Sequence, residues 1–269
     1  MQGRGSPALF TRLYVAAFVA ALFAASPFVL KTPAAHAKAK PVAVVAPTTT
    51  VAPVTTTIAL PPPVAALSFD VEHRLPFDTA PDGRPAVVLT FDDGPHPFFT
   101  PRVLDVLRDR GVHAVFCLVG QQIEAYPQLV ARIANEGHAL CDHTENHDTH
   151  MSRNGDTGYV NAMIQHPADM IRDITGRSPQ FYRGPGGDLS VFIIDRAHQL
   201  GMRILGWSVD PADYRKPGGS VIQDRIMSRV HPGAVVLMHD AGGDRLQTLE
   251  QLAGLIDRLR AAGYSFVLP

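Results

Sequence analysis

The feature that most constrains the fold is a regular alternation of short apolar runs with longer amphipathic segments, from about residue 86 to the end of the chain. The first run, Ala86 to Phe91, stops before a Gly-Pro turn and is typical of a buried strand. Further strand-like runs follow at 113–120, 138–143, 180–183, 203–209, 234–239 and 264–269. Helical spacing lies between them at about 101–110, 127–135, 156–175, 190–200, 220–230 and 246–262. This alternation predicts an α/β fold with a parallel sheet, either open or closed into a barrel.

Polar side chains follow these apolar runs at their carboxyl ends or in the loops just beyond. In barrels of this class, functional groups gather at the carboxyl ends of the strands. The sequence therefore predicts one site at that edge of the sheet. Its candidate members are Asp92, Asp93, His143, Arg183, Asp213 and His239.

Two of these segments carry metal-ligand types: TFDDGP (90–95) and HTENH (143–147). Carboxylates and imidazoles suit a three-ligand catalytic metal site, which leaves one position open. Successive strand residues point to opposite sides, so one aspartate can bind metal while its neighbour acts as a base. Each motif alone has a simpler interpretation, a solvated turn for Asp-Asp-Gly-Pro and coincidence for two histidines among twelve. Together they favour a metal site.

Three further motifs occur in order after these two: YRGPGG (182–187), WSVDPADY (207–214) and VLMHD (236–240). The ordered series of five closely resembles the motifs of polysaccharide deacetylases of the NodB-homology type (carbohydrate esterase family 4). The resemblance covers roughly residues 84–269. It implies a single catalytic domain built as a distorted (β/α) barrel of about seven parallel strands, which the spacing alone does not distinguish from an open sheet.

The resemblance assigns the metal ligands to Asp93, His143 and His147. It implies a divalent metal, usually zinc, with cobalt or nickel as alternatives. One oxygen and two nitrogen ligands fit zinc without excluding its neighbours. Asp142 is a rival ligand, but its counterpart in the family suggests a supporting role.

The same resemblance implies a general base, Asp92, held in position by Arg183. It implies a general acid, His239, oriented by Asp213, because a negative partner keeps an imidazole protonated and fixes its tautomer. Asp210 is the rival for the orienting role.

Three positions are implied to contact the substrate. The backbone N–H of Gly186 helps to bind the oxyanion, although the family usually has an aromatic residue there. Tyr214 stands where tryptophan is more usual. Leu237 lines the pocket for the acetyl methyl group, and a plain core leucine explains it equally well. We interpret Trp207 as a core residue rather than a sugar platform.

The N-terminus has the pattern of a signal peptide, expected to span residues 1–37. Arg4 and Arg12 flank the apolar run Leu13 to Ala25, and Ala-His-Ala at 35–37 offers a cleavage site. An uncleaved membrane anchor is the alternative, since the run extends to Leu30 with two interruptions. Both interpretations place the remaining chain outside the cytoplasm, either extracellular or associated with the cell wall.

Residues 38–66 contain six prolines and six threonines and no periodic apolar face, which predicts an extended linker. We assign 38–83 to the linker and its lead-in, and 84–269 to the catalytic domain. The only two cysteines are Cys117 and Cys141. In an exported protein such a pair favours a disulfide, against the competing interpretation of two buried thiols.

The composition is 46% hydrophobic with a net charge of −1, so a sizeable core is available and nothing suggests a nucleic-acid partner. The sequence predicts an exported, metal-dependent hydrolase, expected to be a monomer, that removes N-acetyl groups from amino sugars in a polysaccharide such as peptidoglycan or chitin. The alternatives are an O-acetyl esterase acting on xylan with the same site, and an inactive carbohydrate-binding homologue.

Overall fold

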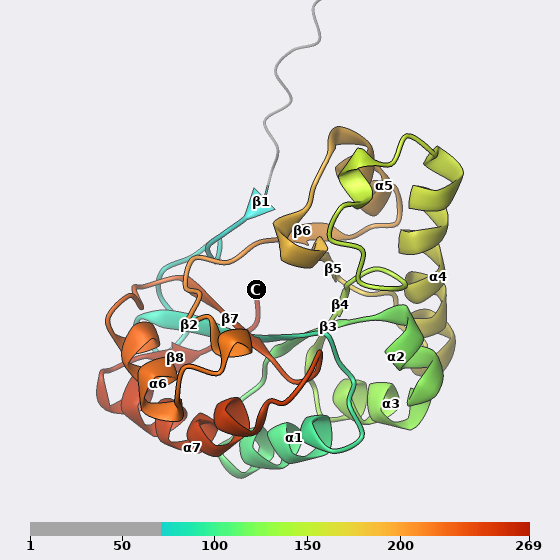
Figure 1. Cartoon of the computed structure of the whole chain (residues 1–269). Helices are drawn as coiled ribbons and strands as arrows, with labels where there is room; N and C mark the ends of the chain where they lie inside the picture. The colour runs from blue at the N-terminus through green and yellow to red at the C-terminus, as the bar shows by residue number, and fades with distance from the viewer. Residues whose placement is uncertain (1–70) are drawn as a thin grey trace, which may run out of the picture. The chain divides into compact units, whose positions relative to one another are not determined.

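The structure, a computed structural model, describes residues 71–269 (Figure 1). The predicted signal segment and the Pro/Thr-rich stretch at 38–66 lie outside these residues. Within the described part of the chain, no helix is both long enough and apolar enough to cross a membrane.

Parallel strands form the centre of the fold. Seven follow one another in the order β1-β6-β5-β4-β3-β2-β7, and β8 pairs with β2. Val209, just beyond β6, forms an isolated bridge to Val236 of β7, so the sheet curls until its two edges approach each other. The predicted distorted barrel of about seven parallel strands is confirmed. The strands are β1 (Val71–Glu72), β2 (Ala86–Asp92), β3 (Val115–Leu118), β4 (Ala139–Asp142), β5 (Phe181–Tyr182), β6 (Arg203–Leu205), β7 (Ala234–His239) and β8 (Ser265–Phe266).

Helices surround the strands, as Figure 1 shows. They are α1 (Phe99–Asp109), α2 (Gly120–Ala125), α3 (Pro127–Asn135), α4 (Thr157–Thr175), α5 (Val191–Gln199), α6 (Gly219–Met227) and α7 (Leu246–Ala261). Local signals explain the ends of α4: the Asp156 side chain accepts hydrogen bonds from the first turn, and Gly176 ends the helix in the left-handed conformation. All six predicted helices are present.

The sequence does not predict one strand, β1, and one α-helix, α2. The two-residue strand β1 lies in the range assigned to the linker and its lead-in, and it pairs with β6. The strand expected over 113–120 ends at Leu118, and α2 begins at Gly120. The Gly120 N–H donates to the carbonyl of Thr144, and a side chain at 120 would collide with Glu145. The close approach of the HTENH loop therefore ends the strand.

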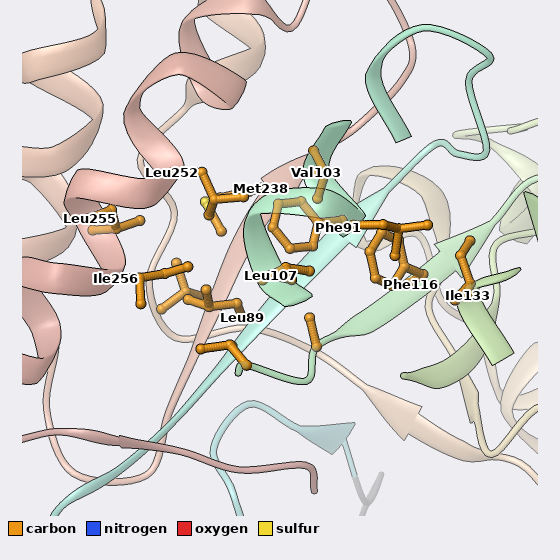
Figure 2. Close-up of a cluster of buried hydrophobic side chains, with 14 of the residues drawn as sticks. Leu89, Phe91, Val103, Leu107, Phe116, Ile133, Met238, Leu252, Leu255 and Ile256 are labelled. Atoms are coloured by element: carbon orange, nitrogen blue, oxygen red, sulfur yellow. The ribbon is translucent and has the colours of Figure 1, made fainter. Parts of the chain in front are cut away.

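The main hydrophobic core lies between the sheet and helices α1, α3 and α7. Figure 2 shows Leu89, Phe91 and Met238 of the sheet facing Leu252 and Ile256 of α7. Every residue of β2 is buried, as its continuous apolar run predicts for a central parallel strand. This core packs against β2 and β7, whose carboxyl ends carry the candidate base, Asp92, and the candidate acid, His239.

Cys117 of β3 and Cys141 of β4 are register partners, with their Cα atoms 4.2 Å apart. They form a disulfide, and both side chains are fully buried. The bridge lies two residues before His143, so it joins the two strands close to the candidate site.

Candidate active site

A cavity of about 390 Å³ opens at the carboxyl ends of the strands. Most of the predicted site residues line it, while Arg183 and Asp213 are buried behind its wall. The predicted residues on the wall are Asp92, Asp93, His143, His147, Gly186, Tyr214, Leu237 and His239.

Three of them form a group suited to a metal ion. The Nε2 atoms of His147 and His143 lie 3.1 and 3.6 Å from Oδ1 of Asp93. That oxygen is buried and has no well-aligned hydrogen-bond donor among the described residues. The three ligand atoms lie within 4.8 Å of one another. One free carboxylate oxygen and two imidazole nitrogens are a donor set that fits a divalent cation such as zinc, and cobalt or nickel would also fit.

The backbone is unusual at two of these residues. Asp93 and His147 have φ values of 75° and 59°, in the left-handed region that non-glycine residues rarely adopt. Each such conformation costs about 1–3 kcal/mol and persists only where the surroundings impose it. Both residues therefore hold their side chains in directions that ordinary loop geometry would not favour.

His143 is held in the tautomer that a metal ligand requires. Its Nδ1 lies 2.7 Å from the carbonyl oxygen of Arg183, which can only accept, so Nδ1 carries the proton. Nε2 is then free to bind a cation. Burial lowers the pKa of His143, which further favours the neutral ring.

Asp93 and His147 influence each other directly. Burial raises the pKa of Asp93, but the contact with His147 and the nearby imidazole charges outweigh this and lower it overall. The same contact raises the pKa of His147. Asp142 is outside the three-ligand group. Its Oδ1 instead accepts the N–H of Thr144, whose hydroxyl accepts the N–H of His147, so Asp142 supports the loop.

Asp92 forms a buried ion pair with Arg183, with Oδ1 2.6 Å from Nη1. The guanidinium also donates to the Thr90 hydroxyl and to the carbonyls of Leu205 and Gly206. Arg183 is only 1% exposed, and every one of these acceptors is fixed in the sheet or the loop after β6. Asp92 is therefore locked in one orientation, and its other oxygen lies 3.7 Å from Nε2 of His143.

His239 pairs with Asp213, with Nδ1 2.7 Å from Oδ1. The second carboxylate oxygen of Asp213 accepts hydrogen bonds from the backbone N–H of His239 and from the Thr248 hydroxyl. Burial lowers the pKa of His239, but the hydrogen bond and charge of Asp213 outweigh it and raise the pKa overall. The rival, Asp210, instead accepts a hydrogen bond from the backbone N–H of Ala212. The structure thus places Asp213, and not its rival, against the imidazole.

The remaining wall carries the predicted substrate-contact residues. Leu237 is 5% exposed and reaches the cavity. Gly186 has a φ of 63°, and a Cβ added there would meet only the Thr149 methyl group at 3.7 Å, so the cavity has room at this point. The sequence favours a core position for Trp207. Its ring does pack against the core, but it also lines the cavity, which the sequence does not reveal.

The family profile described as polysaccharide deacetylase matches residues 79–205. A peptidoglycan-N-acetylglucosamine deacetylase of Bacillus cereus is 33% identical over 189 residues, covering 70% of this chain and 87% of that protein. The chain belongs to this family, the NodB-type polysaccharide deacetylases (carbohydrate esterase family 4).

Other family members agree with this assignment. A chitooligosaccharide deacetylase of Sinorhizobium fredii is 34% identical over 192 residues, covering 68% of this chain and 89% of that protein. The crystal structure of a peptidoglycan N-acetylglucosamine deacetylase superimposes with a TM-score of 0.68 at 32% identity, covering 74% of this chain and 90% of that chain.

Two buried residues of this chain, Arg245 and Asp240, are near the site but are not singled out by the sequence. Arg245 lines the cavity, donates to the carbonyl of Gly242, and lies 3.9 Å from Oδ2 of Asp93. Asp240 accepts a 2.5 Å hydrogen bond from Thr100 and packs against Gly94, and burial raises its pKa to about 7. The position of Asp240 in VLMHD was the only signal; nothing in the spacing marks Arg245.

Proposed function

We propose that this protein is an exported, metal-dependent hydrolase that removes acetyl groups from N-acetylated amino sugars in a polysaccharide. One observation carries the proposal. Around a single cavity lie an arginine-held carboxylate, an aspartate-paired imidazole and an Asp-His-His group, which together supply a base, an acid and a cation site. No part of this set is missing, which argues against an inactive carbohydrate-binding homologue.

Asp93, His143 and His147 would hold the cation. When bound, a divalent metal supplies Lewis acidity that polarises the acetyl carbonyl and makes water a better nucleophile at neutral pH. Zinc is the favoured metal for this donor set, and cobalt and nickel are alternatives.

The protein's own groups would move the protons. Asp92, fixed by Arg183, accepts a proton from the attacking water. The backbone N–H of Gly186 donates to the oxygen that gains charge as the carbonyl is attacked. His239 gives a proton to the amine nitrogen as the C–N bond breaks, which leaves acetate and a free amino sugar. Leu237 offers an apolar contact for the acetyl methyl group.

The substrate is an N-acetylated glycan because the relatives named above act on peptidoglycan and on chitooligosaccharides. Peptidoglycan is favoured, since the predicted signal segment and linker would place the domain outside the cytoplasm, extracellular or at the cell wall. If the segment stays uncleaved, the domain would be anchored to the membrane on its outer side. A monomer satisfies the site, because all of its described groups come from one chain.

The test is acetate release from chitotetraose by the purified protein. Asp92→Asn and His239→Ala should each reduce turnover by at least about 100-fold, the usual contribution of a general acid or base. Asp257→Asn, which changes an exposed carboxylate on α7, is the matched control and should behave as wild type. Circular dichroism and thermal melts should show that the fold persists. Near-normal turnover by either site variant would reject the assignment.

Acetylated xylan, offered in the same assay, separates amide from ester hydrolysis. We expect faster acetate release from chitotetraose. Release from xylan alone would instead support the O-acetyl esterase.

A further inference from the structure

A short turn beside the cavity has an unusual backbone. The 3-10 turn η3 (Asp213–Arg215) is flanked by Ala212 and Lys216, which both have a φ of 53°. Two non-glycine residues in the left-handed region cost about 1–3 kcal/mol each, so contacts must impose the conformation. The Asp210 side chain accepts a hydrogen bond from the backbone N–H of Ala212, and Asp213 is buried against His239. The turn is therefore a fixed structure rather than a loose loop.

This turn presents one aromatic ring and two cations. The Tyr214 ring lines the cavity, with its centroid 5.5 Å from that of the His239 ring. The Arg215 guanidinium lies over the Tyr214 ring, 5.5 Å from its centroid. Lys216 follows directly, and all three side chains are exposed. The Tyr214 ring thus lies beside both the Arg215 guanidinium and the imidazole of His239, the candidate general acid.

The charges of Arg215 and Lys216 are not used within the fold. Across residues 71–269, neither has a carboxylate within 4.0 Å. By contrast, Arg225 and Arg229 nearby donate to the carbonyls of Pro211 and Asp210. Arg215 therefore has no carboxylate partner where it lies over the cavity-lining ring of Tyr214, and Lys216 is the next exposed cation along the turn.

Two of the carboxylates in the cavity wall are paired with basic groups. Asp92 pairs with Arg183, and Asp93 lies between two imidazoles. Asp210 keeps its charge, because it accepts only the backbone N–H of Ala212, and Arg245 adds a cation elsewhere in the wall. An anion beside Tyr214 itself would meet the guanidinium of Arg215, which lies over that ring.

We propose that Arg215, assisted by Lys216, selects glycans whose amino sugars carry carboxylates over neutral glycans. This inference rests on the proposed deacetylase function and adds a substrate class to it. An exposed cation at the edge of a site raises the association rate and gives a modest, salt-sensitive gain in affinity.

The experiment compares three soluble substrates. One is glycan strands of alternating N-acetylglucosamine and N-acetylmuramic acid, which carry lactyl carboxylates. The second is the same strands with these carboxylates converted to neutral amides, and the third is chitotetraose. Acetate release is measured for wild type, Arg215→Gln, and the double variant Arg215→Gln/Lys216→Gln. Arg84→Gln is the matched control, because Arg84 is an exposed arginine just before β2, at the opposite ends of the strands.

We expect kcat/KM on the acidic strands to fall about three-fold for Arg215→Gln and further for the double variant, the range of exposed ion pairs. The two neutral substrates should be unaffected. The loss should vanish at about 1 M salt, where the Debye length is only about 3 Å. Arg84→Gln should match wild type on all three.

Equal losses on all three substrates would overturn the proposal, because Arg215 would then only support Tyr214. Unchanged turnover of the acidic strands would overturn it as well. Absence of acetate release by wild type from every substrate would instead reject the proposed function itself, so the two failures are distinguishable.

Discussion

Three candidate site residues, Asp92, His143 and His239, each have one polar side-chain atom held by the protein and a second one facing the site. Arg183 fixes one oxygen of Asp92, and its carbonyl fixes Nδ1 of His143. Asp213 fixes Nδ1 of His239 in the same way. Arg183 thus orients both the candidate base and a candidate metal ligand, through its side chain and its backbone. Such prior orientation removes part of the entropy cost of reaching the transition state.

Asp213, the partner of the candidate general acid His239, should set the alkaline limit of activity. His239 must be protonated to donate, and Asp213 raises its pKa. In Asp213→Asn the charge is lost, so the pKa of His239 falls and the alkaline decline of kcat/KM moves to lower pH. Acetate release across the neutral and alkaline range measures this shift. An unchanged profile would show that Asp213 does not control this proton.

Asp240 should make stability depend on pH. Its folded pKa of about 7 lies above the ordinary value of 3.8, so its protonated form stabilises the fold fully at low pH. This contribution is lost as pH rises through about 7. Relative to Asp240→Asn, wild type should therefore lose about 4 kcal/mol of unfolding free energy as the pH rises from below 3.8 to above about 7. Urea unfolding of both proteins in chelator provides the comparison; parallel pH dependences would contradict the assignment.

Strand register brings the candidate base and acid together. Asp92 of β2 is the register partner of His239 of β7, although 147 positions separate them along the chain. Asp240 continues the pairing, since its N–H donates to the carbonyl of Asp92. Because β2 and β7 are buried on both faces, their register cannot slip without exposing the core.

The disulfide should stabilise the strand pair that leads to His143. It closes a loop of 24 positions between Cys117 and Cys141, for which loop-closure entropy predicts about 3 kcal/mol. The double variant Cys117→Ala/Cys141→Ala should lose about that much unfolding free energy, measured with denaturant. The same loss should appear in wild type unfolded with reductant present. Equal stability of variant and wild type would show that the bridge is not formed.

The elements that the sequence predicts well are those with a complete local signal. The run Ala86 to Phe91 and the capped helix α4 each carry such a signal, and both are present. The two-residue strand β1 has no periodicity to detect, and its pairing with β6 depends on a residue pair 133 positions apart. Helix α2 begins where it does because of a contact with a distant loop. Tertiary contacts decide these cases.

The site residues likewise divide into those that a sequence motif marks and those that only the tertiary structure reveals. The five ordered motifs mark Asp93, His143 and His239, all of which line the cavity. Arg245 reaches the same cavity from a loop that no pattern marks, and Trp207 faces both core and cavity. Side-chain direction in irregular segments follows from packing, which a single sequence does not encode locally.

At the scale of the whole molecule, parallel topology explains how a long chain assembles one small site. Every strand of the sheet runs in the same direction, so the segments after β2, β4, β5 and β7 all emerge at one edge (Figure 1). Residues from Asp92 to His239 therefore reach one cavity of about 390 Å³. The fold brings these residues to one edge of the sheet, and the left-handed backbone of Asp93 and His147 sets the direction of their side chains.

The central claim is that Asp93, His143 and His147 gather a divalent cation on which deacetylation depends. The most direct test is acetate release from chitotetraose by protein stripped with a chelator, titrated with zinc. We expect no turnover in the stripped protein, and recovery that saturates at one equivalent of zinc. Undiminished turnover by the metal-free protein would contradict the account.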